Sequence, residues 1–109
     1  MKREIERLLY QARVTPIYVG YHYFTSAVML VYENQGKHLS TCKGIYIPIA
    51  EQYGADPRSV ERDLRTVRDV FMRNNGKLVL EEMGYEVWRE RPYPRELFEI
   101  FAAYLRNFS

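Results

Sequence analysis

The chain has 109 residues, of which 47% are hydrophobic, and its formal net charge is +2 at pH 7. This length fits one domain, and the ten Tyr and five Phe supply large side chains for its core. The single cysteine, Cys42, excludes an internal disulfide and a cysteine-based metal cluster. No segment has the apolar run of a signal peptide or the ~20 apolar residues of a membrane span. We therefore expect one cytoplasmic domain over residues 1–109.

The first two predicted elements are helices. Apolar residues recur at helical spacing over residues 2–13, and Pro16 ends this segment because the residue before a proline is pushed out of the helical conformation. A second apolar stripe covers residues 21–33 and stops at Asn34-Gln35-Gly36. This second stretch is also rich in β-branched and aromatic side chains, so its sequence would suit a strand as well.

The middle of the chain predicts two further helices. Over residues 45–53 Pro48 leaves two alternatives, because a proline is best accommodated in a first helical turn. The helix begins near Ile47, or it begins near Thr41 and is bent at the proline. The following helix, residues 57–73, opens with an aspartate as N-cap and a proline as its first residue.

The last third of the chain is less uniform. Residues 77–88 are ambiguous and fit a short helix closed by Gly84, followed by an extended piece. Two prolines then precede a final helix over residues 95–107, which has one apolar face. The fold class predicted from these segments is all-α, as a compact bundle of about six helices with short connections.

The helix over residues 57–73 carries arginines at a spacing that core packing does not require. At ~100° per residue its apolar positions form one stripe, made of Val60, Leu64, Val67 and Phe71. The opposite face holds Arg58, Arg62, Arg65, Asp69 and Arg73, and a flank holds Glu61 and Arg68. Such faces are usually solvated and carry ion pairs, here Glu61–Arg65 and Asp69 with Arg65 or Arg73. The cations are all arginines, however, and the planar guanidinium suits guanine edges and phosphates.

The residues before this helix match the pattern of a helix-turn-helix unit. A small residue, Ala50, lets two helices approach, Gly54 makes the turn, and Val60 joins the second helix to the first. Three other residues are expected in the core of the unit: Ile49, Tyr53 and Ala55. The sequence therefore predicts a helix-turn-helix whose second helix carries the arginine face.

Three stretches resemble one known family in order and over nearly the whole chain: GYHYFTSAVMLVYENQ, LSTCKGIYIPIAEQYGADPRSVERDLRTVRDVF and GYEV followed by ELFEIFAAYLR. They are similar to the C-terminal effector domain of the stage-zero sporulation response regulator of endospore-forming Firmicutes. The most specific element is SVER-x-x-R, residues 59–65. The resemblance implies a transcription regulator that binds duplex DNA at TGTCGAA-like boxes, often as tandem dimers, with residues 57–73 as the recognition helix.

The resemblance also implies roles for individual residues. The positions that match the family's base-reading residues are Glu61, Arg62 and Arg65. The positions expected at the DNA backbone are Arg58, Ser59, Thr41 and Lys43. The chemistry fits, because arginine can donate two hydrogen bonds to guanine and a carboxylate can accept from the amino group of cytosine.

Two departures from the family pattern bear on these expectations. The chain begins at Met1, just before the first predicted helix, so we expect no receiver domain and carry over no phosphorylation switch. Asp63 and Asp69 add negative charge to the recognition helix, and each would repel phosphate if it faced the groove. The rival hypothesis is a protein–protein adaptor that keeps the fold, has lost DNA binding, and uses these two acids for a partner.

No enzyme, metal or cofactor site is predicted. His22 and His38 have no carboxylate or cysteine at ligand spacing and are expected to be exposed or half-buried. Cys42 lacks the context of a nucleophile and is expected to be a small buried residue. The aromatic residues of the segment 18–24 are expected in the core, since little positive charge is interleaved with them.

Overall fold

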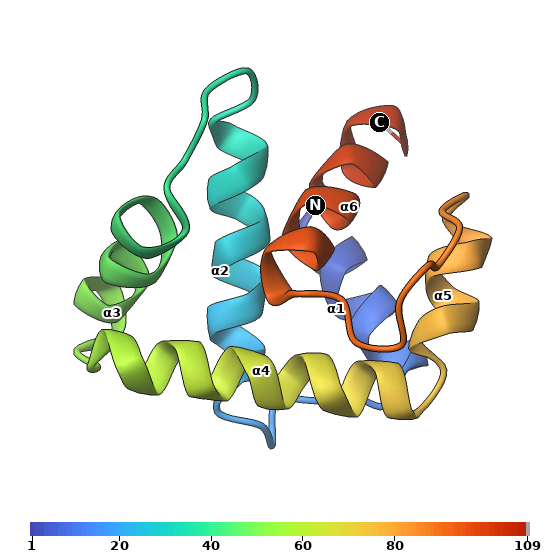
Figure 1. Ribbon diagram of the computed structural model, residues 1–109, viewed down its shortest axis with the longest axis horizontal. Coiled ribbons are helices and arrows are strands. Elements are labelled where there is room, and N and C mark those ends of the chain that lie inside the picture. Colours follow the sequence, from blue (N-terminus) through green and yellow to red (C-terminus); the bar gives the residue numbers. More distant parts are fainter. Residues whose placement is uncertain (109) are drawn as a thin grey trace.

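Six α-helices and one π-helical segment make up the part of the chain described by the computed structural model, residues 1–108, and no strand occurs in that part (Figure 1). In chain order the elements are α1 (Lys2–Gln11), α2 (Gly20–Glu33), the π-helical segment η1 (Thr41–Tyr46), α3 (Ile47–Tyr53), α4 (Pro57–Arg73), α5 (Gly76–Glu82) and α6 (Pro94–Phe108). The prediction of an all-α fold is therefore confirmed, and the strand alternative for α2 is wrong.

The core is built around α2, which packs beside α6, while α4 crosses the lower end of α2 (Figure 1). Phe24 of α2 is fully buried and meets Phe98 and Phe101 of α6 edge to face, with ring centroids 5.2 Å apart in both pairs. Phe101 also meets Phe71 of α4 at 5.8 Å. Edge-to-face contacts of this kind add to the free energy of burying the rings. One aromatic cluster thus joins the three longest helices.

The helix α4 crosses the N-terminal end of α2 at very short range. A Cβ atom at Gly20 would lie 2.3 Å from the carbonyl oxygen of Asp63 and 2.8 Å from Cγ2 of Val67. Only a glycine lets the two backbones approach this closely. The first residue of α2 therefore fixes the position of α4, the helix that carries the predicted site.

Most predicted boundaries agree with the structure to within a residue or two. The first helix ends two residues earlier than predicted, at Gln11, because Arg13 takes a left-handed conformation (φ 64°) and the N–H of Val14 turns back to the carbonyl of Leu9. Both alternatives around Pro48 are partly right. The α-helix begins at Ile47, and the helical path begins earlier, at η1.

Candidate nucleic-acid interface

The helices α3 and α4 form the predicted helix-turn-helix. Gly54 closes α3 in the left-handed conformation (φ 64°, ψ 38°), and the N–H of Ala55 donates to the carbonyl of Ala50 at 2.8 Å. Ala50 and Val60 are both buried, as the pattern predicted. The turn is a left-handed C-cap, which glycine adopts without steric cost.

The N-terminus of α4 is capped in the way the sequence indicated. The side chain of Asp56 accepts a hydrogen bond from the N–H of Arg58 at 2.8 Å, and Pro57 is the first helical residue. A capped helix start leaves further backbone N–H groups directed out of the helix, where an anion can bind. Arg58 is exposed there and Ser59 is half-buried.

The outer face of α4 is exposed and mainly cationic. Its exposed residues include all four arginines that the spacing placed there: Arg58, Arg62, Arg65 and Arg73. The side chain of Arg62 is 71% exposed, and its Nε donates to Oδ1 of Asp63 at 3.3 Å. The carboxylate of Asp63 is thus occupied by the neighbouring arginine on the same helix.

Glu61 and Arg65 form the ion pair expected from their spacing. Nη2 of Arg65 lies 2.5 Å from Oε1 of Glu61, and both side chains keep a large exposed fraction, 60% for the arginine and 38% for the glutamate. An exposed pair of this kind contributes little to stability. Its effect is to hold the arginine in one orientation on the outer face.

A cavity of about 520 Å³ brings Glu61 and Arg65 together with the start of η1. Thr41 and Cys42 line it from η1, and Arg95 lines it from α6. The structure therefore places Thr41 beside two of the predicted base-reading residues. Lys43 is exposed on η1, and its N–H donates weakly to the hydroxyl of Ser40, the N-cap of that segment, at 3.4 Å.

The cavity has a positioning residue that the sequence analysis missed. Nη1 of Arg95 donates to the carbonyl oxygen of Leu39 at 2.6 Å and to the hydroxyl of Thr41 at 3.1 Å, while its Nε donates to Glu99 at 3.0 Å. The arginine therefore ties the N-terminal end of α6 to the start of η1. Because Leu39 and Thr41 are more than fifty residues away from Arg95, no local pattern could have revealed this link.

Tyr46 lines the same cavity, and the charged residues around it act on the pKa of its phenol. Burial raises the pKa of Tyr46, and the negative charge of Glu61 acts in the same direction. Arg65, Arg95 and Arg68 oppose this shift with their positive charges. The net effect is a raised pKa, because burial is the largest of these influences.

Asp69 does not pair with Arg65 or Arg73, so those two predicted alternatives are wrong. Its Oδ1 accepts from Nε of Arg68 at 2.7 Å and from Nη2 of Arg91 at 3.2 Å. Although burial alone would raise the pKa of Asp69, the hydrogen bonds and charges of Arg68 and Arg91 outweigh it and lower the pKa below its ordinary value.

Arg68 itself is buried, which the flank position had not suggested. Its Nη1 donates at 2.9 Å to the carbonyl oxygen of Pro92, in the segment that leads into α6. This segment, residues 83–93, packs against α4 and covers the arginine. Arg68, which helical spacing placed on a flank, therefore links α4 to a segment far away in the sequence.

Two side chains lie where the sequence analysis did not expect them. Cys42 is exposed rather than buried, because η1 turns its first residues to the surface. Tyr53 is 41% exposed rather than in the core, although its ring meets Tyr23 edge to face at 5.2 Å and its hydroxyl lies 2.7 Å from that of Ser26.

The two histidines and the aromatic residues of the segment 18–24 lie where the sequence analysis expected them. His22 and His38 are exposed. The aromatic residues of the segment 18–24 are mostly buried, with Tyr18 half-buried. Within residues 1–108 no group of three or more histidine, cysteine or acidic residues is placed to hold a metal ion. In the same part of the chain, no helix is long and apolar enough to cross a membrane.

The fold and the site together define a helix-turn-helix domain of the kind that binds duplex DNA. Comparison with known families agrees: the model of the family described as Sporulation initiation factor Spo0A C terminal matches residues 5–105, and this chain belongs to that family. The family is one of DNA-binding regulators of transcription and is not an enzyme family. Searches of the curated proteins and of the solved structures found no match.

Proposed function

We propose that this chain regulates transcription by sequence-specific binding to duplex DNA, with α4 as the recognition helix in the major groove. The observation that carries the proposal is the exposed arginine face of α4, directly after a helix-turn-helix turn. A helix fits the major groove, which is ~12 Å wide. Tandem TGTCGAA-like boxes, bound by a pair of copies in the cytoplasm, are the target that the family resemblance suggests.

The base-reading roles fall to Glu61, Arg62 and Arg65. Each arginine can donate two hydrogen bonds to O6 and N7 of a guanine, and the glutamate can accept from the amino group of a cytosine. A good bidentate contact contributes ~1–3 kcal/mol of discrimination against a wrong base. The guanidinium groups are exposed, so they need little rearrangement to reach a base edge.

The backbone roles fall to two groups of residues on either side of the turn. Arg58 and Ser59 lie in the first turn of α4, where free N–H groups also favour phosphate. Thr41 and Lys43 lie at the start of η1, which Arg95 anchors through its bond to Thr41. Contacts of this kind fix the orientation on the duplex and carry no sequence information.

The test is fluorescence anisotropy of a labelled duplex with tandem boxes against a scrambled duplex, at low and at moderate salt. We expect tighter binding to the boxes, with an affinity that falls as salt rises. Arg65→Ala should cost ~1–3 kcal/mol on the boxes and much less on the scrambled duplex. Arg3→Ala, which removes the same charge from the exposed start of α1, is the matched control.

Each contrary result has a distinct meaning. An equal loss on both duplexes would mean that Arg65 contacts only phosphate. Equal binding of the wild-type chain to both duplexes would remove the claim of sequence specificity. No binding even at low salt would favour the adaptor hypothesis.

A further inference from the structure

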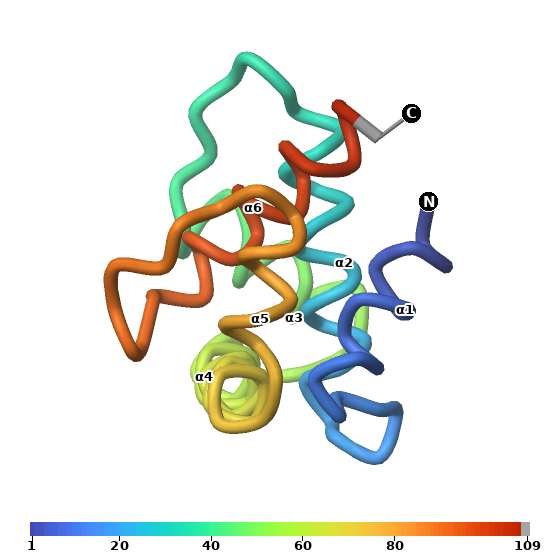
Figure 2. Tube along the Cα trace, turned by 90° about the vertical axis from the view of Figure 1, so that its right-hand side faces the viewer, coloured from blue at the N-terminus to red at the C-terminus, as the bar shows by residue number. Residues whose placement is uncertain are grey.

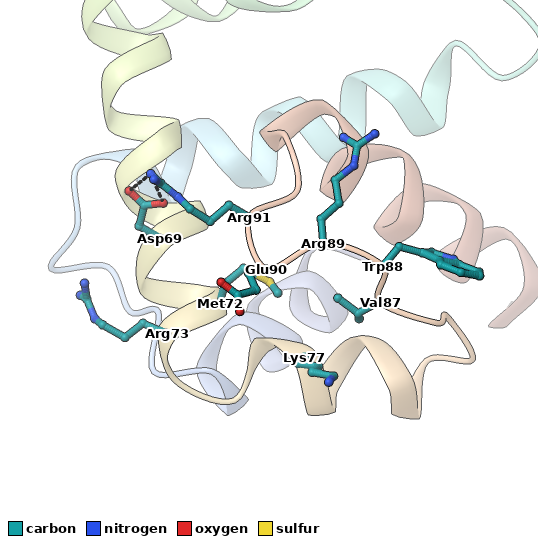
Figure 3. Close-up of a pocket in the computed structure, with 9 residues that line it drawn as sticks. All are labelled: Asp69, Met72, Arg73, Lys77, Val87, Trp88, Arg89, Glu90 and Arg91. Carbon is teal, nitrogen blue, oxygen red and sulfur yellow. Dashed lines mark hydrogen bonds and ion pairs between the residues drawn. The ribbon is translucent and has the colours of Figure 1, made fainter.

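A second basic surface continues the outer face of α4 toward its C-terminal end. It is a groove of about 670 Å³ between the end of α4, the start of α5 and residues 87–91 (Figure 3). Four cations line the groove, Arg73, Lys77, Arg89 and Arg91, against two carboxylates, Asp69 and Glu90. None of the roles assigned above uses this groove.

Residues 87–91 form one wall of the groove, and contacts with α4 fix this wall in place. Arg91 pairs with Asp69 at 3.2 Å, and the buried Arg68 holds the carbonyl of Pro92 at 2.9 Å. Asp69 also accepts from Arg68 at 2.7 Å, so its charge is already balanced. A wall that is ordered before binding spares a ligand the entropic cost of ordering it.

The arrangement of the charged side chains around the groove suits an extended polyanion better than a single small anion. In Figure 3 the charged ends of Arg73, Lys77 and Arg89 extend from the groove in different directions and do not converge on one point. Among the described residues, neither Arg73 nor Lys77 forms an ion pair, so both charges are available to a ligand. Met72 and Val87 supply half-buried apolar surface between them.

The distance from the proposed base-reading residues to this groove is similar to the width of the major groove of DNA. Arg73 follows Arg65 by eight positions, which at 1.5 Å per residue is ~12 Å along the helix axis. This length is about the width of the major groove. With the N-terminal half of α4 between the two strands, the C-terminal end of α4 therefore reaches the backbone that borders the groove.

We infer that this groove binds the sugar–phosphate backbone of the same duplex, in the stretch that flanks the bases read by α4. The inference rests on the proposed function, because it takes the position of α4 in the major groove as its starting point. It extends the DNA contact surface from the helix-turn-helix to the segment before α6. Figure 2 shows that segment, in orange, on the side of the molecule away from the N-terminus.

The test compares two duplexes that carry the same box, one with flanks of about ten base pairs, one helical turn, and one trimmed at the box edges. The variant is the double substitution Arg73→Ala with Lys77→Ala, and the control is Lys2→Ala with Arg3→Ala, the same charge loss at the exposed start of α1. Far-UV circular dichroism and urea unfolding establish that both variants fold.

On the flanked duplex we expect the Arg73/Lys77 variant to bind roughly tenfold more weakly. The slope of log affinity against log salt concentration should fall by about two, because each lost phosphate contact contributes about 0.9 to that slope. On the trimmed duplex we expect it to bind like the wild-type chain. The preference for the box over a scrambled flanked duplex should be retained. The control should match the wild-type chain on both duplexes.

The chain supplies its own probe for this groove. Trp88 is the single tryptophan, it lines the groove, and it is 86% exposed. Saturating flanked duplex should protect Trp88 from quenching by acrylamide, a neutral quencher whose access does not depend on charge, and trimmed duplex should not.

Two results would overturn the inference: an Arg73/Lys77 variant that binds the flanked duplex with wild-type affinity and salt slope, or Trp88 quenching that flanked duplex leaves unchanged. Failure of the proposed function would be seen separately, as equal binding of the wild-type chain to boxed and scrambled duplexes. Binding to neither would overturn both.

Discussion

Replacing Gly20 by alanine tests how closely α2 and α4 approach. A Cβ at this position would lie 2.3 Å from a backbone oxygen of Asp63, where 3.4–4 Å is ordinary contact, so the two helices must separate by about 1 Å. Helix propensity alone favours alanine over glycine by up to ~1 kcal/mol. Overpacking costs ~1–3 kcal/mol or more, and a backbone neighbour cannot change rotamer to relieve it. We expect a net destabilisation of ~2 kcal/mol, from ~3 kcal/mol of overpacking against ~1 kcal/mol of propensity.

The assay is urea unfolding followed by far-UV circular dichroism, with the melting temperature as a second measure. For a domain of this size, ~2 kcal/mol corresponds to a fall of roughly 8–16 °C. Gly36→Ala is the comparison without overpacking, because a Cβ there meets nothing within 4 Å and the cost is only that of its positive φ of 84°, ~1 kcal/mol. A Gly20→Ala chain as stable as the wild type, or more stable as propensity alone predicts, would refute the close approach.

Two further predictions concern buried polar groups. Arg68→Met keeps the aliphatic length but leaves the carbonyl of Pro92 without its donor, so we expect a loss of ~1–3 kcal/mol in urea unfolding; a change below ~0.5 kcal/mol, the level of ordinary surface substitutions, would contradict this role. Burial and the hydrogen bond to Glu6 raise the pKa of Tyr21 to about 12, so its stabilising contribution is present below pH ~10 and is lost as the pH rises through about 12. Tyr21→Phe should therefore remove the component that titrates near pH 12 from the absorbance titration of the tyrosines. It should also reduce the fall in the free energy of unfolding between about pH 10 and 12. If both curves were unchanged, the raised pKa of Tyr21 would be contradicted.

The elements that the sequence predicted well are those specified by local chemistry. Both ends of α4 follow from signals within a few residues: the aspartate N-cap, the following proline, and the Asn-Asn-Gly that stops the helix. The early end of α1 has no such signal, because it depends on a left-handed arginine, Arg13. The π-helical geometry of η1 was not predictable either, since no residue pattern in that stretch distinguishes it from an α-helix.

The features of the site likewise divide into those that local spacing predicts and those that depend on residues far away in the sequence. Helical spacing identified the outer face of α4, because exposure there depends only on which side of the helix is buried. The environment of Arg68 depends on residues 83–93, which lie far away in the sequence and pack over it in space. For the same reason the spacing suggested partners for Asp69 on its own helix, while the structure pairs it with Arg68 and Arg91.

The acids on α4 were the main objection to a DNA-binding role, and the structure changes how they are to be understood. Each of them contacts an arginine: Glu61 holds Arg65, Asp63 holds Arg62, and Asp69 holds Arg68 and Arg91. A guanidinium has five donors, so an arginine that gives one or two of them to a carboxylate keeps others for a guanine or a phosphate. Holding a long side chain in place before binding also reduces the entropy lost at the interface. We infer that Glu61 and Asp63 orient Arg65 and Arg62 on the outer face. The repulsion of phosphate by all three carboxylates is largely offset, because each already lies against a positive charge.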